Sequence, residues 1–292
     1  MSESARDRYT EMLQRGYDPG VIRQAPNLER GDADPCVVEV QNFLKHYGYF
    51  DYEAGGLDVA PEPGRLDEVT VRALTGFQMR YSVGTPGILD APTRELMAAP
   101  RCGVPDLVGG PSAFFSTVCA WNRRNLSYQF GRVGSPMLTA DLAQGRVINA
   151  VRRAFNTWAA AGVGLSFRMI SGGDIPMDAD IRIEWRRAAD PDTSMVGGAV
   201  AHADFPPGCS VVTNDFPKPL HFDDEEETWV DGAVPGGLDI ETVALHEIGH
   251  LLGLAHTDVS GSVMWPYVST NLTLRTLQAD DLAGIRALYP VT

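Results

Sequence analysis

The sequence predicts an α+β protein in which a small all-helical domain precedes a larger domain of mixed strands and helices. Between residues 36 and 99, apolar side chains recur at helical spacing and are interrupted by stretches rich in glycine and proline. Residues 100–120 show no period, which indicates a linker. From residue 121 onward, the two-residue repeat of strands alternates with the helical repeat.

The composition restricts the class of protein before any motif is considered. With 292 residues, 44% of them hydrophobic, the chain can bury the cores of two modest domains. Its formal net charge of -14 argues against nucleic acid as a partner, because phosphate binding requires a cationic surface. No run approaches the roughly 18 apolar residues of a membrane span, and the N-terminus lacks the apolar core of an export signal. We therefore expect a soluble monomer without a membrane span.

Three helices are predicted in the first domain, which is expected at residues 36–99. Residues 1–35 are polar and lack a sustained period, so we expect a loosely ordered lead-in there. The apolar faces of the first two helices are formed by Val37, Val40, Phe43, Leu44 and Tyr47, and by Thr70, Leu74, Phe77 and Tyr81. A third, short helix is expected at APTRELMAA, with Pro92 in its first turn.

The larger domain is expected at residues 121–292 and begins with a strand at 125–132. Thr139 is expected to cap a helix with an apolar face formed by Ile148, Val151, Phe155 and Trp158. The elements expected after it are strands at 165–170 and 180–186, an irregular segment at 188–237, and helices at 239–252 and 278–288.

The segment HEIGHLLGLAH, residues 246–256, carries the strongest chemical signal. On a helix, His246 and His250 are one turn apart and project from the same face, so both can bind one Zn²⁺. Glu247 lies beside them, where it can accept a proton from the attacking water without being a ligand. Gly253 can take the left-handed conformation that ends the helix, which allows His256 to return as the third ligand. Three protein ligands leave the fourth position open, as a catalytic zinc requires.

Met264, in SVMWPY, follows the third histidine of this motif and would lie beneath the three ligands. Together the two features resemble the metzincins and, within them, the matrix metalloproteinases, or matrixins. The resemblance implies a catalytic domain with a mixed, mostly parallel five-stranded sheet and three helices. It also implies a zinc-dependent endopeptidase that acts on secreted or extracellular proteins.

The segment PRCGVPD, residues 100–106, resembles the matrixin cysteine switch. A thiolate is a strong zinc ligand, so Cys102 can fill the fourth position and exclude water. The resemblance implies that Arg101 and Asp106 pair to hold this loop in the cleft. It also identifies residues 36–99 as a propeptide whose fold is shared with peptidoglycan-binding modules. The chain would then be a zymogen, with residues 100–120 as switch and activation linker and an activating protease cutting between Leu107 and Cys119.

The resemblance implies further metal sites. His202 and His221 match two ligands of a second, structural zinc. The stretch RRAADPDT lacks the family's histidine, which leaves Asp190 as the best remaining ligand and Asp192 as the next. The acidic run after His221 resembles a calcium site, in which the hard carboxylate oxygens would come from Asp223 and Glu226.

The resemblance also describes how substrate would bind. The strand around 200–203 would be an exposed edge to which an extended peptide adds by main-chain pairing. An apolar side chain after the scissile bond would enter a pocket beside His246, walled by Pro266 and Tyr267. The loop 268–277 would set the depth of this pocket. Because the chain ends after the closing helix, we expect no hemopexin domain to follow.

Cys119 and Cys209 have no counterpart in the family pattern, and a disulfide between them is a hypothesis that export would favour. Cys36 would then be free. Two other functions compete with the peptidase. One is a glycan-binding protein whose helical domain targets peptidoglycan, which retention on insoluble peptidoglycan would reveal. The other is a zinc-stabilised structural domain, but such sites close the fourth position permanently and have no use for Glu247.

Overall fold

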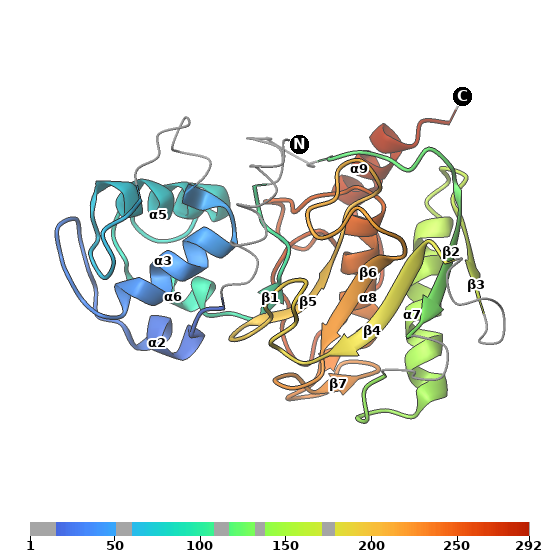
Figure 1. The fold of residues 1–292 in the computed structure, drawn as a ribbon, viewed down its shortest axis with the longest axis horizontal. Coiled ribbons are helices and arrows are strands. Elements are labelled where there is room, and N and C mark those ends of the chain that lie inside the picture. The colour runs from blue at the N-terminus through green and yellow to red at the C-terminus, as the bar shows by residue number, and fades with distance from the viewer. Residues whose placement is uncertain (1–15, 51–59, 108–116, 132–137, 171–178, 292) are drawn as a thin grey trace.

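A computed structural model describes residues 16–50, 60–107, 117–131, 138–170 and 179–291. The helical domain and the sheet-containing domain lie side by side, and the switch segment runs between them (Figure 1). The predicted activation cut falls largely within 108–116, outside the described residues.

In the described part of the first domain, α2 (Pro19–Gln24) precedes the three predicted helices. In chain order the helices are α2, α3 (Val37–His46), α5 (Glu68–Tyr81) and α6 (Ala91–Met97). Aspartates cap three of them: the side chains of Asp18, Asp67 and Asp90 each accept backbone N–H groups from the first helical turn. Aromatic residues fill the core between the helices, with Phe43 and Phe77 edge to face at 5.3 Å.

The expected loose lead-in is wrong for residues 16–35. Tyr17, Ile22 and Leu28 are buried in the same core as the predicted helices. The segment contains one helix of six residues, and its buried side chains are irregularly spaced. A pattern of this kind has no measurable period, so the sequence did not show that this segment folds with the domain.

The second domain is built on the predicted parallel sheet. Its strands are β2 (Asn125–Phe130), β3 (Ser166–Met169), β4 (Ile181–Arg186), β5 (Ala199–Ala203) and β6 (Lys218–Asp223). Only β5 runs antiparallel to its neighbour β6 among these five, which confirms a mixed, mostly parallel five-stranded sheet. A sixth strand, β1 (Arg101–Cys102), comes from the linker and pairs in parallel with β5. A separate pair is formed by β7 (Trp229–Val230) and β8 (Leu238–Asp239).

The three predicted helices of this domain are α7 (Gln144–Ala159), α8 (Ile240–Leu251) and α9 (Ala279–Leu288). Trp158 on α7 donates a hydrogen bond of 2.8 Å to the carbonyl of Leu245, which joins α7 to α8. The predicted cap at Thr139 is wrong, because α7 begins at Gln144 and the Thr139 hydroxyl instead accepts the N–H of Asp141.

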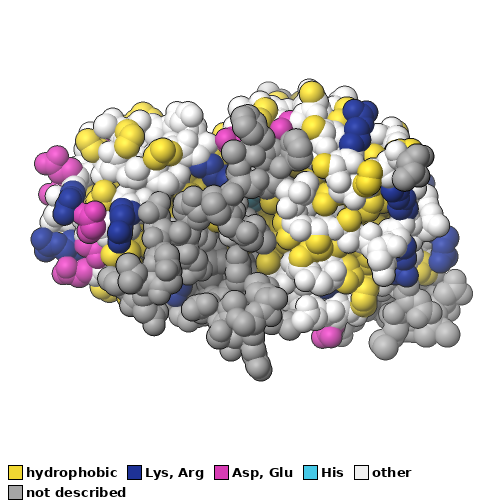
Figure 2. Space-filling model, turned by 90° about the horizontal axis from the view of Figure 1, so that it is seen from above, with side chains coloured by type: hydrophobic (Ala, Val, Ile, Leu, Met, Phe, Trp, Pro, Cys, Tyr) yellow, Lys and Arg dark blue, Asp and Glu magenta, His cyan; other side chains and the backbone are white. Residues whose placement is uncertain are grey.

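The described helices and one face of the molecule show how helix length and surface charge are distributed. None of the described helices has both the length and the apolar character needed to cross a bilayer. On the face shown in Figure 2, basic and acidic side chains intermingle on the helical domain.

Candidate active site

Helix α8 positions the first two predicted metal ligands. Its N-cap Asp239 accepts the N–H of Thr242 at 3.0 Å, and all of its residues are buried. The helix ends before Gly253, which has a φ of 100°. A Cβ at this glycine would lie 1.7 Å from the carbonyl oxygen of Cys119, so a side chain cannot fit. The turn brings His256 back beside His246 and His250 on the helix, as predicted.

The three histidines direct their Nε2 atoms toward one point. The Nε2 of His250 lies 3.1 Å from that of His246 and 3.2 Å from that of His256. Each Nδ1 faces an oxygen: the carbonyl of Val263 at 2.7 Å, the carbonyl of Leu254 at 2.7 Å and the carboxylate of Asp106 at 2.8 Å. These oxygens accept hydrogen bonds, so each Nδ1 carries the hydrogen and each Nε2 presents a lone pair.

Burial keeps these imidazoles neutral. It lowers the pKa of His246 to about 3 and that of His256 to about 4, and it holds the pKa of His250 well below its ordinary value. Three facing lone pairs repel one another unless a cation lies between them. The donor set therefore fits a metal ion of the zinc type.

Cys102 completes this donor group from β1. Its Sγ lies 3.5 Å from the Nε2 of His250, and the four donor atoms all lie within 4.8 Å of one another. The N–H of Val104 donates to the sulfur at 3.3 Å. Burial, and then Glu247, raise the pKa of this thiol well above its usual value, so a thiolate here requires a cation beside it.

Glu247 lies next to the donor group and is fully buried. Neither of its carboxyl oxygens has a hydrogen-bond partner among the described residues. Burial raises its pKa to about 8. A buried carboxyl group without a partner is costly, and such groups are typical of functional sites.

Arg101 and Asp106 form the predicted pair, and both side chains are fully buried. The Arg101 guanidinium lies 3.6 Å from the ring centre of Tyr47 and 4.7 Å from that of Tyr267. Burial alone would raise the pKa of Asp106, but the Arg101 charge, the hydrogen bond with His256 and the Arg80 charge together hold this pKa well below its usual range. Asp106 therefore contacts both Arg101 and the Nδ1 of His256.

The helical domain contacts this site through residues for which the sequence gave no signal. Arg80 donates to the carbonyl of His256 at 2.8 Å, and the Tyr49 hydroxyl donates to Asp106 at 2.6 Å. The ring of Tyr81 meets that of Trp265 edge to face at 5.2 Å. The apolar pattern marked Tyr81 as a core residue of its helix, and no pattern marked Tyr49 or Arg80 as contacts.

A small pocket lies beside the donor group. It is a cavity of about 40 Å³ whose walls include the predicted Pro266 and Tyr267, together with Val243, Leu272 and Leu274. Met264 is buried, and its sulfur would lie 2.3 Å from a Cβ at Gly249, so it packs directly against α8 beneath the ligands. This is the position that the sequence predicted for it.

Comparison with known proteins agrees with this geometry. The matrixin family model matches residues 120–290. The chain belongs to the matrixin family. A model of a peptidoglycan-binding domain matches residues 34–97.

Curated relatives support the same assignment. The hatching enzyme of Paracentrotus lividus is 38% identical over 90% of this chain and 40% of its own length. Matrix metalloproteinase-19 of Mus musculus is 32% identical over 86% of the chain and 43% of its own length. Stromelysin-2 of Rattus norvegicus is 36% identical over 75% of the chain and 43% of its own length. This matrixin thus spans about two fifths of the length of these relatives.

A second donor group in this matrixin lies on β5 and β6. His202 and His221 face each other in the register of the two strands, and both are fully buried. Asp190 places its Oδ2 2.8 Å from the Nδ1 of His221 and 3.5 Å from the Nε2 of His202. Asp192 lies 3.7 Å from the same Nδ1 and is more exposed. The structure thus brings together the three residues proposed for the structural zinc.

The acids predicted for calcium are arranged differently. Asp223 is buried and accepts the N–H of Glu225 at 2.8 Å, while Glu226 accepts the N–H of Gly197 at 2.8 Å. Burial raises the pKa of Asp223 to about 6. Neither residue belongs to a metal-donor group among the described residues, so calcium here stays a prediction.

The structure settles two further expectations. Cys119 and Cys209 form a disulfide with Cα atoms 6.3 Å apart, which confirms the hypothesis, and Cys36 is free and buried. The edge of β5 is not exposed, because β1 pairs with it from the linker. The sequence could not show that Arg101 and Cys102 would occupy the strand edge expected to bind substrate.

Proposed function

We propose that this matrixin is a latent zinc-dependent endopeptidase whose own Cys102 blocks the catalytic metal. The observation that carries the proposal is the convergence of three histidine Nε2 atoms with the Cys102 sulfur. Membership in the matrixin family supports the choice of zinc. The short β1 strand, paired with β5, holds the sulfur in place and explains how the linker can act as a plug.

The residues at the site support a hydrolytic mechanism. His246, His250 and His256 would hold zinc, which supplies Lewis acidity and lowers the pKa of water toward about 7. Glu247 would accept the proton of the attacking water and pass it to the leaving amine. Its buried, unpartnered carboxyl group is suited to exchanging protons in this way.

The binding of substrate would follow the removal of β1. Once this strand leaves, β5 offers its backbone edge to an extended peptide, which favours cleavage within a chain rather than at its ends. The pocket beside Cys102 would receive an apolar side chain after the scissile bond. We expect an activating protease to release the switch by cutting between Leu107 and Cys119.

Other parts of the proposal concern metals and compartment. The group of Asp190, His202 and His221 would hold a second zinc, and Asp223 with Glu226 would bind calcium. The disulfide favours an oxidising compartment, and the substrates would be secreted or extracellular proteins. We expect the chain to act as a monomer.

A quenched peptide with leucine after the scissile bond tests the proposal. The wild-type chain should be silent, the Cys102→Ser variant should hydrolyse the peptide, and a chelator should abolish this activity. Adding Glu247→Ala should lower the rate by at least about 100-fold without releasing zinc, because only the proton carrier is lost. Silence of all three proteins with zinc bound would contradict the proposal.

The match to a peptidoglycan-binding domain supports a second candidate, in which the helical domain binds glycan. Its residues Arg80 and Tyr81 contact the catalytic domain in this structure, which favours the latent peptidase. Retention of the full chain on insoluble peptidoglycan distinguishes the two, since the zymogen is expected to pass unbound.

A further inference from the structure

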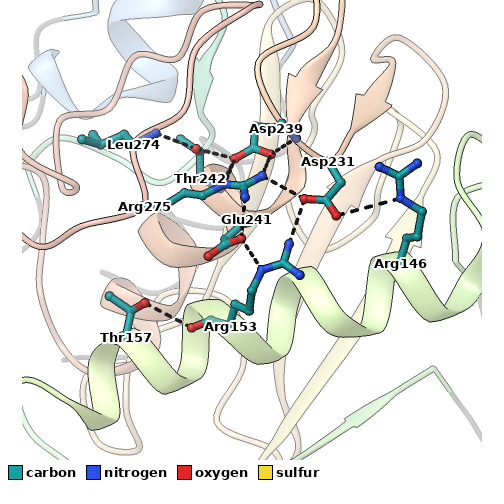
Figure 3. A network of polar contacts seen from close by, with 10 residues as sticks. Arg146, Arg153, Thr157, Asp231, Asp239, Glu241, Thr242, Leu274 and Arg275 are labelled. Atoms are coloured by element: carbon teal, nitrogen blue, oxygen red, sulfur yellow. Dashed lines mark hydrogen bonds and ion pairs between the residues drawn. The ribbon is translucent and has the colours of Figure 1, made fainter.

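Arg275 ties the loop 268–277 to the start of α8. Its guanidinium contacts three carboxylates: Asp239 at 2.5 and 2.9 Å, Asp231 at 2.9 Å and Glu241 at 3.0 Å. Figure 3 shows this side chain reaching into the acidic group between α8 and α7. The side chain is only 29% exposed, so these contacts are stronger than those of a surface ion pair.

A second contact fixes the loop at the neighbouring residue. The N–H of Leu274 donates to the hydroxyl of Thr242 at 2.8 Å, and that hydroxyl donates to Asp239 at 2.7 Å. Asp239 therefore accepts hydrogen bonds from Arg275 and Thr242 and serves as the N-cap of α8. The loop is attached to the same helix that carries the first two zinc ligands.

These contacts affect the shape of the pocket, because Thr242, Leu272 and Leu274 line it. Leu274 directly precedes Arg275, so the ion pairs of Arg275 attach the loop next to a residue that lines the pocket. The cavity of about 40 Å³ holds roughly three water molecules, at about 10–15 Å³ of accessible volume each. In the latent chain, where Cys102 also lines the pocket, this space corresponds to a short aliphatic side chain.

We propose that Arg275 is a positioning residue that fixes the floor of this pocket and thereby restricts cleavage to bonds followed by short apolar side chains. The inference rests on the proposed peptidase function. It identifies one side chain and its acidic partners as the determinant of pocket depth in this chain. Without Arg275, the loop keeps the Leu274 amide contact but loses its ionic attachment, and the floor can move away from α8.

The test compares two peptides in the full chain carrying Cys102→Ser. One peptide has leucine after the scissile bond, and the other has 4-phenylphenylalanine. Arg275→Ala should raise the ratio of kcat/KM for the long side chain over leucine by about tenfold, the scale of discrimination that a hydrophobic pocket achieves for small changes in side-chain size. Thr242→Val removes the other attachment and should change the ratio in the same direction.

Arg146→Ala is the matched control. Arg146 belongs to the same charge network, but its Nε lies 3.9 Å from Asp231 and it does not contact the loop. This variant should leave the ratio unchanged. If Arg275→Ala lowers kcat/KM equally for both peptides, or if Arg146→Ala shifts the ratio as much, the proposal is overturned.

Hydrogen exchange of residues 268–277 gives a readout that needs no activity. Arg275→Ala should make amide exchange in this loop about tenfold faster, while Arg146→Ala should not change it. If the Cys102→Ser parent is inactive, only the proposed peptidase function is contradicted. Hydrogen exchange then still tests whether Arg275 attaches the loop. Unchanged exchange in Arg275→Ala would overturn the inference even if the parent is active.

Discussion

Both histidine groups of this protein are buried, but they differ in which part of the chain supplies the remaining metal donor. In the first, each Nδ1 is held by an oxygen and the Nε2 atoms of His246, His250 and His256 converge from a helix and its following turn. Its remaining donor, Cys102, lies on a linker. In the second, paired strands carry the histidines, and Asp190 belongs to the same domain. Because a donor on a linker can move away without disturbing the domain, we expect the first group to open on activation and the second to stay closed.

The largest difference should appear when one histidine of each group is replaced in the Cys102→Ser background. His250→Ala should lower peptide hydrolysis by at least about 10⁴-fold, because without zinc the pKa of water returns from about 7 toward 15.7. His202→Ala should reduce metal content by one equivalent and keep most of the activity. Activity against the quenched peptide and metal content of the same preparations provide the measurement. Equal loss of activity in both variants would contradict the prediction that only the first histidine group takes part in hydrolysis.

Removal of Asp106 tests how strongly the linker holds Cys102 beside the three histidines. Asp106→Ala leaves the Arg101 charge buried without its partner, which costs about 3–5 kcal/mol. The switch should therefore open without cleavage, and the uncut chain should hydrolyse the peptide at least about 100-fold faster than wild type. Tyr267→Phe removes one hydrogen bond to Arg101 and should cost only about 1 kcal/mol. An Asp106→Ala chain that stays latent with its zinc bound would show that Cys102 alone holds the switch.

The disulfide joins a segment near the second histidine group to a segment near the first. Cys209 lies in the connection between β5 and β6, and the carbonyl of Cys119 packs against Gly253 in the turn before His256. Replacing both cysteines by serine should lower the free energy of unfolding by about 2–4 kcal/mol, since the bridge closes a sequence separation of 90 residues. Calorimetry should show a Tm lower by about 5–15 °C. Cys36→Ser is the control for a buried cysteine outside the bridge, and a matching decrease in its Tm would remove the special role of the disulfide.

The parts of the site that the sequence predicted are those fixed by local spacing. His246 and His250 share a helix face because they are four residues apart, and Gly253 is required by the turn that follows. The motif around Cys102 likewise places Arg101 and Asp106 in one short segment. In each case the chain itself brings the residues together, so pattern and resemblance were sufficient.

The parts that were missed depend on contacts between distant segments. Arg80 reaches the carbonyl of His256 only because two domains pack together, and no local pattern records this packing. Tyr17 is buried within an irregular segment, and β1 covers the edge of β5 although the linker shows no period. Thr139 shows the converse error, because a side chain suited to capping a helix can equally hold a turn.

The smallest expected effect concerns the acids of the second group. Asp190→Ala removes the carboxylate that two buried imidazoles share and leaves Glu184, 3.5 Å from the Nε2 of His221, which should cost about 1–3 kcal/mol and lower the Tm by about 2–8 °C. Metal content should fall by one equivalent while peptide hydrolysis in the Cys102→Ser background changes by less than about twofold. Asp192→Ala is the matched variant, because this carboxylate is 3.7 Å from His221 and its side chain is 39% exposed. Its effect on unfolding should stay within about 0.5 kcal/mol. If Asp192→Ala releases as much metal as Asp190→Ala, both carboxylates are ligands, and the second group is closed by four protein donors rather than by three and a water.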